Sequence, residues 1–195
     1  MTTHHRLPDT RSGLVIETHD LPRRAGSMKQ VRRTADAPDE LGIGVIGVPP
    51  HSPIELDLRL EAVGEGVLVT GTAEVQLTGE CTRCLKPLSD TDTVDIQELF
   101  YYPGNGPDDD EAARIAGELI DLEPLLRDAV VLDLPFSPLC RDDCAGLCPQ
   151  CGANLNDEPD HDHAETADSR WAGLATWSSG EAEHVAGDIP AQDEE

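Results

Sequence analysis

Aromatic residues, positive charges and long apolar runs are all scarce in this sequence. Phe, Trp and Tyr make up 3% of the 195 residues, and 14 Lys and Arg stand against 39 Asp and Glu, for a formal net charge of −25. No apolar run approaches the ~18 residues of a membrane-spanning helix, and the first residues lack the apolar centre of a secretion signal. We therefore expect a cytoplasmic protein with no membrane partner.

Catalytic motifs are absent as well. The sequence contains no P-loop, no G-x-G-x-x-G, no G-x-S-x-G and no H-E-x-x-H. Catalytic zinc also needs an open coordination position and a nearby general base, and no such pattern accompanies the cysteines. We predict that the protein is not an enzyme and has no small-molecule substrate.

The acidic charge argues against broad wrapping of nucleic acid, because such binding depends on neutralising phosphates. Residues 1–34 are the exception, with seven Arg and Lys against three acids. The simplest interpretation of their basic stretch is a solvated loop or a partly disordered arm. The functional interpretation is an RNA or ribosome contact. The candidate RNA-contact residues are Arg23, Arg24, Lys29, Arg32 and Arg33.

Alternation of apolar and polar residues predicts two hairpins. Ile54 to Ala62 alternate strictly, and Val67 to Glu80 repeat the pattern after a Gly-rich turn, as half-buried antiparallel strands do. Asp92 to Tyr102 has the pattern of a returning strand. A C-x-x-C motif formed by Cys81 and Cys84 is therefore expected at a hairpin tip.

The apolar spacing then changes to three and four, which predicts an amphipathic helix from Ile120 to Leu134. Asp121 is a suitable N-cap, and Pro124 is tolerated in the first turn. The predicted fold class is α+β: an antiparallel sheet of hairpins, with a barrel-like sheet as an alternative, packed by one helix and followed by a C-terminal zinc-knuckle appendage. The expected divisions are a flexible N-terminus at 1–13, the α+β domain at 14–147, a zinc-knuckle extension with a short helix at 148–177 and a disordered acidic tail at 178–195.

All six cysteines lie in three short motifs, and two histidines follow them. In a reducing compartment clustered cysteines favour metal over disulfides, and thiolates two or three residues apart suit tetrahedral zinc. The candidate ligands are Cys81, Cys84, Cys140, Cys144, Cys148, Cys151, His161 and His163.

Two ligand assignments are open. In the preferred one, Cys81, Cys84, Cys140 and Cys144 bind one zinc ion. The second ion is then bound by Cys148, Cys151, His161 and His163. In the other assignment the two C-x-x-C motifs face each other across a single zinc-ribbon site, and the C-x3-C cysteines are ordinary thiols. Thiol–disulfide exchange at the first C-x-x-C is disfavoured, because redox motifs of this kind normally begin a helix.

Several motifs, taken together, resemble a known family. They are Arg23 to Met28, Gly66 to Gly71, Gly79 to Leu85, Ile120 to Pro124, Leu134 to Cys140 and Gly146 to Asn156. As a set, over residues 14–177, they resemble the bacterial YceD family, the large ribosomal RNA subunit accumulation proteins. The resemblance implies that the first C-x-x-C and the C-x3-C are general to the family. The second C-x-x-C is a feature of some members, where a C-x-C follows; here that position holds His161 and His163.

The resemblance implies a non-enzymatic role in the synthesis, processing or stability of large-subunit (23S) ribosomal RNA. Ribosomal precursor particles, a ribosomal protein or the rRNA are the implied partners. The alternative function is that of a zinc-ribbon adaptor in a transcription or other protein complex.

Overall fold

The computed structural model describes residues 8–107, 112–163 and 170. The chain divides into two compact units, Met1–Glu158 and Pro159–Glu195, and the fold below is that of the first. The short helix and the acidic tail predicted beyond residue 170 lie outside the described residues, so the four-part division stays a prediction. No helix in the described ranges is both long and apolar enough to cross a membrane.

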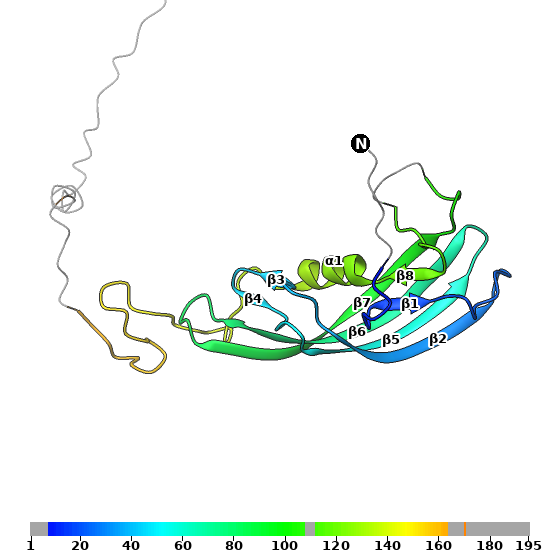
Figure 1. Ribbon diagram of the computed structural model, residues 1–195. Helices are drawn as coiled ribbons and strands as arrows, with labels where there is room; N and C mark the ends of the chain where they lie inside the picture. Colours follow the sequence, from blue (N-terminus) through cyan, green and yellow to red (C-terminus); the bar gives the residue numbers. More distant parts are fainter. Residues whose placement is uncertain (1–7, 108–111, 164–169, 171–195) are drawn as a thin grey trace, which may run out of the picture. The chain divides into compact units, whose positions relative to one another are not determined.

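Six strands form one antiparallel sheet, in the order β2-β5-β6-β4-β3 with β7 paired to β6 (Figure 1). The strands are β2 (Met28–Asp36), β3 (Gly42–Ile43), β4 (Ile46–Gly47), β5 (Pro53–Ala62), β6 (Gly66–Glu80) and β7 (Pro87–Tyr101). The hairpins predicted from the alternating pattern are confirmed. Apolar positions of β5 and β6, such as Leu58, Leu60 and Val69, are fully buried, because successive side chains of a strand point to opposite faces.

Strand β6 is the centre of this sheet. It pairs with β7 along its whole length, from Gly66 opposite Tyr101 to Glu80 opposite Pro87. On its other edge it pairs first with β5 and then, near its end, with the short β4. The last residue pair between β6 and β7, Glu80 and Pro87, lies next to Cys81. The first C-x-x-C therefore does lie at a hairpin tip.

The barrel-like alternative is wrong. Within the described ranges β2 pairs with β5 alone and β7 pairs with β6 alone among the strands of this sheet, so the sheet stays open. One buried face is enough to explain the alternating pattern, which does not distinguish an open sheet from a closed one.

One helix, α1 (Glu123–Asp133), buries Leu126 and Val130. The amphipathic helix predicted after the sheet is therefore confirmed, and it is the one helix among the described residues, but its predicted start at Ile120 is wrong. Residues Leu119–Asp121 form strand β8, which pairs with β1 (Val15–Glu17) as a separate two-stranded sheet. The N-cap prediction for Asp121 is also wrong, because the N-cap is Leu122 and Asp121 ends β8. The Asp121 carboxylate nevertheless accepts a hydrogen bond from the Glu123 N–H at 3.0 Å, and Pro124 lies in the first turn.

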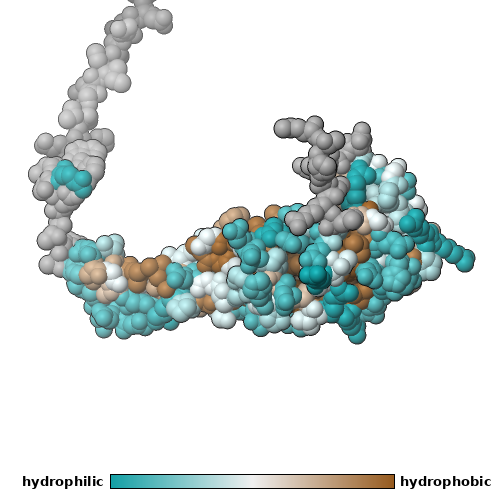
Figure 2. All heavy atoms as spheres, in the orientation of Figure 1, coloured by the Kyte–Doolittle hydropathy of each residue, from teal (hydrophilic) through white to brown (hydrophobic). Residues whose placement is uncertain are grey.

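The loop or arm expected for the basic stretch is also wrong from Met28 onward, where β2 begins. Val31 and Ala35 are its buried positions, and the residues between them are polar. Lys29, Arg32 and Arg33 are consequently strand residues. Figure 2 shows that hydrophilic residues cover most of the visible face of this unit, with smaller apolar patches among them.

Candidate metal centre

The turn between β6 and β7 is a tight knuckle. Cys81 N–H donates to the Lys86 carbonyl at 2.9 Å, and Leu85 N–H donates to the Cys81 carbonyl at 2.8 Å. Closing this turn places Leu85 at φ 57°, in the left-handed region. Cys81 is fully buried and Cys84 is 4% exposed, so both side chains point inward at the hairpin tip.

The segment after α1 brings two more cysteines to this tip. The Pro138 carbonyl accepts hydrogen bonds from the Thr82 N–H and hydroxyl, which fixes the chain just before Cys140. The sulfur of Cys84 lies 3.6 Å from that of Cys140. The sulfurs of Cys81 and Cys144 are 3.8 Å apart, and all four sulfurs lie within 4.8 Å of one another.

These distances fit one tetrahedral ion. With Zn–S bonds of about 2.3 Å, the tetrahedral angle places two sulfurs roughly 3.8 Å apart. Cys81, Cys84 and Cys144 form a small buried cluster of their own, with Leu88, Leu139 and Leu147 packed against it. Three of the four sulfur donors are buried and Cys140 is exposed, and together they could hold one metal ion.

The environment divides the thiols into two kinds. Burial raises the pKa of Cys81, but the backbone N–H groups of Cys84, Cys140 and Arg83 outweigh it and lower this pKa to about 6. Desolvation and the neighbouring thiols, Cys144 foremost, raise the pKa of Cys140 to about 12. The backbone dipoles around Cys81 therefore already favour a thiolate, which is the form that binds metal.

Residues 153–157 return to this cluster after the second C-x-x-C. The side-chain amide of Asn156 donates to the Cys144 sulfur at 3.4 Å, and its oxygen accepts from the Ala145 N–H at 2.9 Å. Lys86 binds both carboxylate oxygens of Asp157 at 3.1 Å. Such surrounding hydrogen bonds orient metal ligands and tune their basicity. Nothing in the sequence pattern pointed to Asn156, since only the fold brings it to the thiol.

The second C-x-x-C repeats the backbone of the first. Gly152 N–H donates to the Cys148 carbonyl at 2.8 Å, and Cys148 N–H donates to the Ala153 carbonyl at 2.8 Å. Gly152, at φ 77°, holds the position that Leu85 has in the first knuckle. The two motifs therefore share one turn geometry, which aims two sulfurs at a common point.

His161 and His163 belong to the second compact unit. Their Nε2 atoms lie 2.8 Å apart, so both rings direct a nitrogen to the same place. Because Cys148 and Cys151 lie in the first unit, the binding of one ion by all four residues stays a prediction from the sequence.

The shared turn gives a reciprocal prediction. Leu85→Gly should stabilise the first knuckle by about 0.5–1 kcal/mol. The free energy gained by removing the left-handed strain of leucine exceeds the entropic cost of ordering glycine. The side chain lost is 59% exposed. Gly152→Leu should destabilise the second knuckle by about 1–2 kcal/mol. Hydrogen exchange of the amide at each position measures both effects. Faster exchange in Leu85→Gly would contradict the interpretation.

The candidate RNA-contact residues have different partners in the structure. Lys29 pairs with Asp20 at 2.6 Å and Arg32 with Asp57 at 3.0 Å. Arg33 donates to two backbone carbonyls near β1. Arg23 and Arg24 lie in the exposed loop before β2, where the Arg23 guanidinium lies 5.1 Å from the centre of the Tyr102 ring. A role in RNA contact stays a prediction for all five.

Several known proteins are similar to this chain. An uncharacterized protein of Mycobacterium tuberculosis (strain ATCC 25618 / H37Rv) is 44% identical over 181 residues, which cover 91% of this chain and 87% of the relative. An uncharacterized protein of Mycobacterium leprae is 37% identical over 84% of this chain and 76% of its own length. The large ribosomal RNA subunit accumulation protein YCED homolog 1, chloroplastic, of Arabidopsis thaliana is 23% identical over 75% of this chain and 52% of its own length.

No solved structure matches the chain. The family model described as large ribosomal RNA subunit accumulation protein YceD matches residues 69–176. This range begins within the central strand β6 and contains all six cysteines. The match covers more than half of the sequence, and we conclude that the chain belongs to the YceD family.

Proposed function

We propose that this protein is a zinc-stabilised, non-enzymatic factor for the accumulation of large-subunit (23S) ribosomal RNA. It acts in the cytoplasm, on ribosomal precursor particles through rRNA or a ribosomal protein. The observation that carries the proposal is the family match over residues 69–176, which contains the four-thiol cluster. The name of the Arabidopsis relative supports the same role.

In this proposal the metal has a structural task. Cys81, Cys84, Cys140 and Cys144 are the ligands of the first zinc ion. A bound ion would join the hairpin tip to the segment after α1, across the sequence separation of 56 between Cys84 and Cys140. Closing a loop of this length restricts the unfolded chain strongly. The second ion is assigned to Cys148, Cys151, His161 and His163.

The charge of the chain also supports a role beside ribosomal components. A net charge of −25 repels RNA over most of the surface but attracts basic proteins. Arg23 and Arg24 are exposed cations in the loop before β2. The proposed factor would therefore bind a basic ribosomal protein with its acidic surface while this loop contacts RNA.

Depletion of the protein should reduce mature large subunits and 23S rRNA, while 16S rRNA is spared. Sucrose-gradient profiles and quantification of both rRNAs measure this result. Re-expression of the wild-type chain is the control. Normal profiles and normal 23S rRNA would refute the role. Copurification with RNA polymerase or regulators, without ribosomal precursors, would identify an adaptor in its place.

A further inference from the structure

A small pocket lies on the first unit, and none of its lining residues belongs to the cysteine motifs. Its volume is about 210 Å³, less than the roughly 300–1,000 Å³ of pockets for drug-sized ligands. Its polar and aromatic lining comes from His19, Arg23, Tyr102 and Glu118, and Leu21 and Val67 add buried apolar surface. The pocket can therefore admit one ring system but not a large cofactor.

The fold holds the walls of this pocket in place. The Glu118 carbonyl accepts hydrogen bonds from the Thr18 N–H at 2.8 Å and the Thr18 hydroxyl at 3.1 Å. The Tyr102 N–H donates to the Glu65 carbonyl at 3.0 Å. These bonds connect segments that are distant in sequence, so the pocket is largely preformed and little ordering is needed when a ligand binds.

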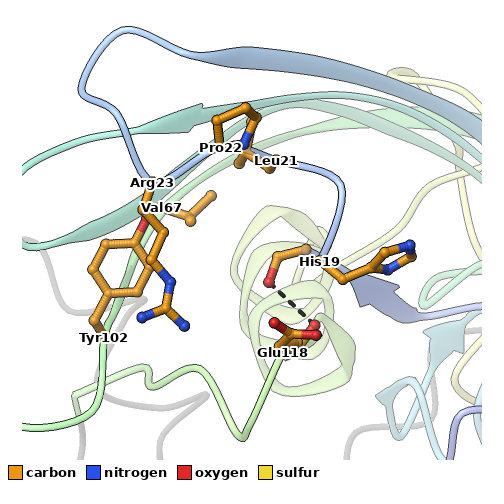
Figure 3. Close-up of a pocket in the computed structure, with 8 residues that line it drawn as sticks. His19, Leu21, Pro22, Arg23, Val67, Tyr102 and Glu118 are labelled. Carbon is orange, nitrogen blue, oxygen red and sulfur yellow. Dashed lines mark hydrogen bonds between the residues drawn. The ribbon is translucent and has the colours of Figure 1, made fainter.

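The two sides of the pocket offer different chemistry. Figure 3 shows the Tyr102 ring and the Arg23 guanidinium on one side, and His19 and Glu118 on the other. The guanidinium lies 5.1 Å from the ring centre, which makes a flat, cationic stacking surface. The Glu118 carboxylate opposite accepts hydrogen bonds. A fitting ligand thus has a flat ring, an amino donor and a negative charge beside it.

Other ligand classes fit this arrangement less well. A free anion would meet the carboxylate of Glu118. An arginine or lysine of a basic protein would meet Arg23, which already lies over the Tyr102 ring, so like charges would repel. An unpaired nucleotide has the required combination, because its base can stack on aromatic and guanidinium planes while its edge donates and its phosphate carries charge.

We propose that this pocket binds one unpaired nucleotide of RNA. The base stacks on the Arg23 guanidinium, which lies over the Tyr102 ring, and its exocyclic amino group donates to Glu118. Arg24, the next residue of the exposed loop, supplies positive charge for the adjacent phosphate. This inference rests on the proposed role in rRNA accumulation and assigns a contact site to it. Adenine and cytosine carry the amino group and uracil does not, so A and C should be preferred over U.

Fluorescence anisotropy with labelled RNA decamers of A, C or U, added to the full zinc-loaded chain, tests the site. Tyr102→Ala should weaken binding of the A and C decamers by about 5- to 100-fold, the range for loss of one stacked base. Tyr102→Phe should keep the wild-type affinity. Glu118→Ala should remove the preference over U. With one or two phosphates neutralised, log affinity should fall against log salt with a slope of about −0.7 to −1.4.

Arg59→Ala is the matched charge control for Arg23→Ala, since Arg59 pairs with Glu61 on β5 and does not line the pocket. Weaker binding in Arg23→Ala alone supports the site, whereas an equal loss in both variants overturns it. Wild-type binding by Tyr102→Ala with normal zinc content, equal binding of U, or no RNA binding at all would also overturn it. So would Tyr102-dependent binding of an arginine decapeptide in place of RNA. Each of these results leaves the depletion experiment unaffected, so the two proposals fail separately.

Discussion

Cys81→Ser is expected to lose the first zinc ion and to unfold the hairpin tip. Cys81 is fully buried and its sulfur lies 3.8 Å from that of Cys144, so a shorter, harder oxygen cannot replace it as a ligand. Structural zinc contributes on the order of 10 kcal/mol in small domains. Elemental analysis should show a fall from two zinc ions per chain to one. Amides of residues 81–86 and 140–147 should exchange much faster.

Cys148→Ser is the matched control, because it removes one thiol of the same geometry from the other knuckle. It should also leave one zinc ion, but amides of residues 81–86 should stay protected. Complete loss of metal in both variants would support a single ribbon site between the two C-x-x-C motifs. Unchanged metal content in Cys81→Ser would show that the four thiols are not a metal centre.

The elements that the sequence predicts correctly are those whose apolar residues recur with one unambiguous period. Strict alternation in β5 and β6 and the spacing in α1 each have one structural explanation. Strand β2 was missed because only Val31 and Ala35 are buried between polar residues. The predicted start of the helix is wrong because Ile120 fits both the helical spacing and the alternating spacing of a strand. Its backbone pairing with Ile16 of β1 places it in a strand.

The candidate site divides in the same way. Clustered cysteines and their spacing were visible in the sequence, since chelation by neighbouring ligands is local. The sequence leaves open which cysteine pairs meet, because that depends on the path of the chain from β7 through α1 to Cys140. The pocket was not predicted at all. Its lining includes Arg23, Tyr102 and Glu118, which no sequence spacing connects and only the folded chain brings together.

Gly71→Ala is expected to destabilise the sheet itself by about 3 kcal/mol or more. Gly71 lies in the middle of β6, between Leu58 of β5 and Ile96 of β7. Its φ is +151°, and an added Cβ would lie 2.1 Å from the Asp57 carbonyl oxygen. Backbone strain and overpacking each cost about 1–3 kcal/mol, and the obstructing atoms are backbone of a paired strand, which cannot turn away. Urea unfolding monitored by circular dichroism measures the loss.

Gly64→Ala is the control for Gly71→Ala, because an added Cβ there meets nothing within 4 Å. It should be neutral or should stabilise the protein by up to about 1 kcal/mol, since alanine restricts the unfolded chain. A cost below about 1 kcal/mol for Gly71→Ala would show that β5 can move away from β6.

Comparison with Cys81→Ser then separates two sources of stability. The cysteine variant should leave the amides of β5 and β6 protected, whereas Gly71→Ala should expose them even with zinc in excess, because the main core does not include the thiol cluster.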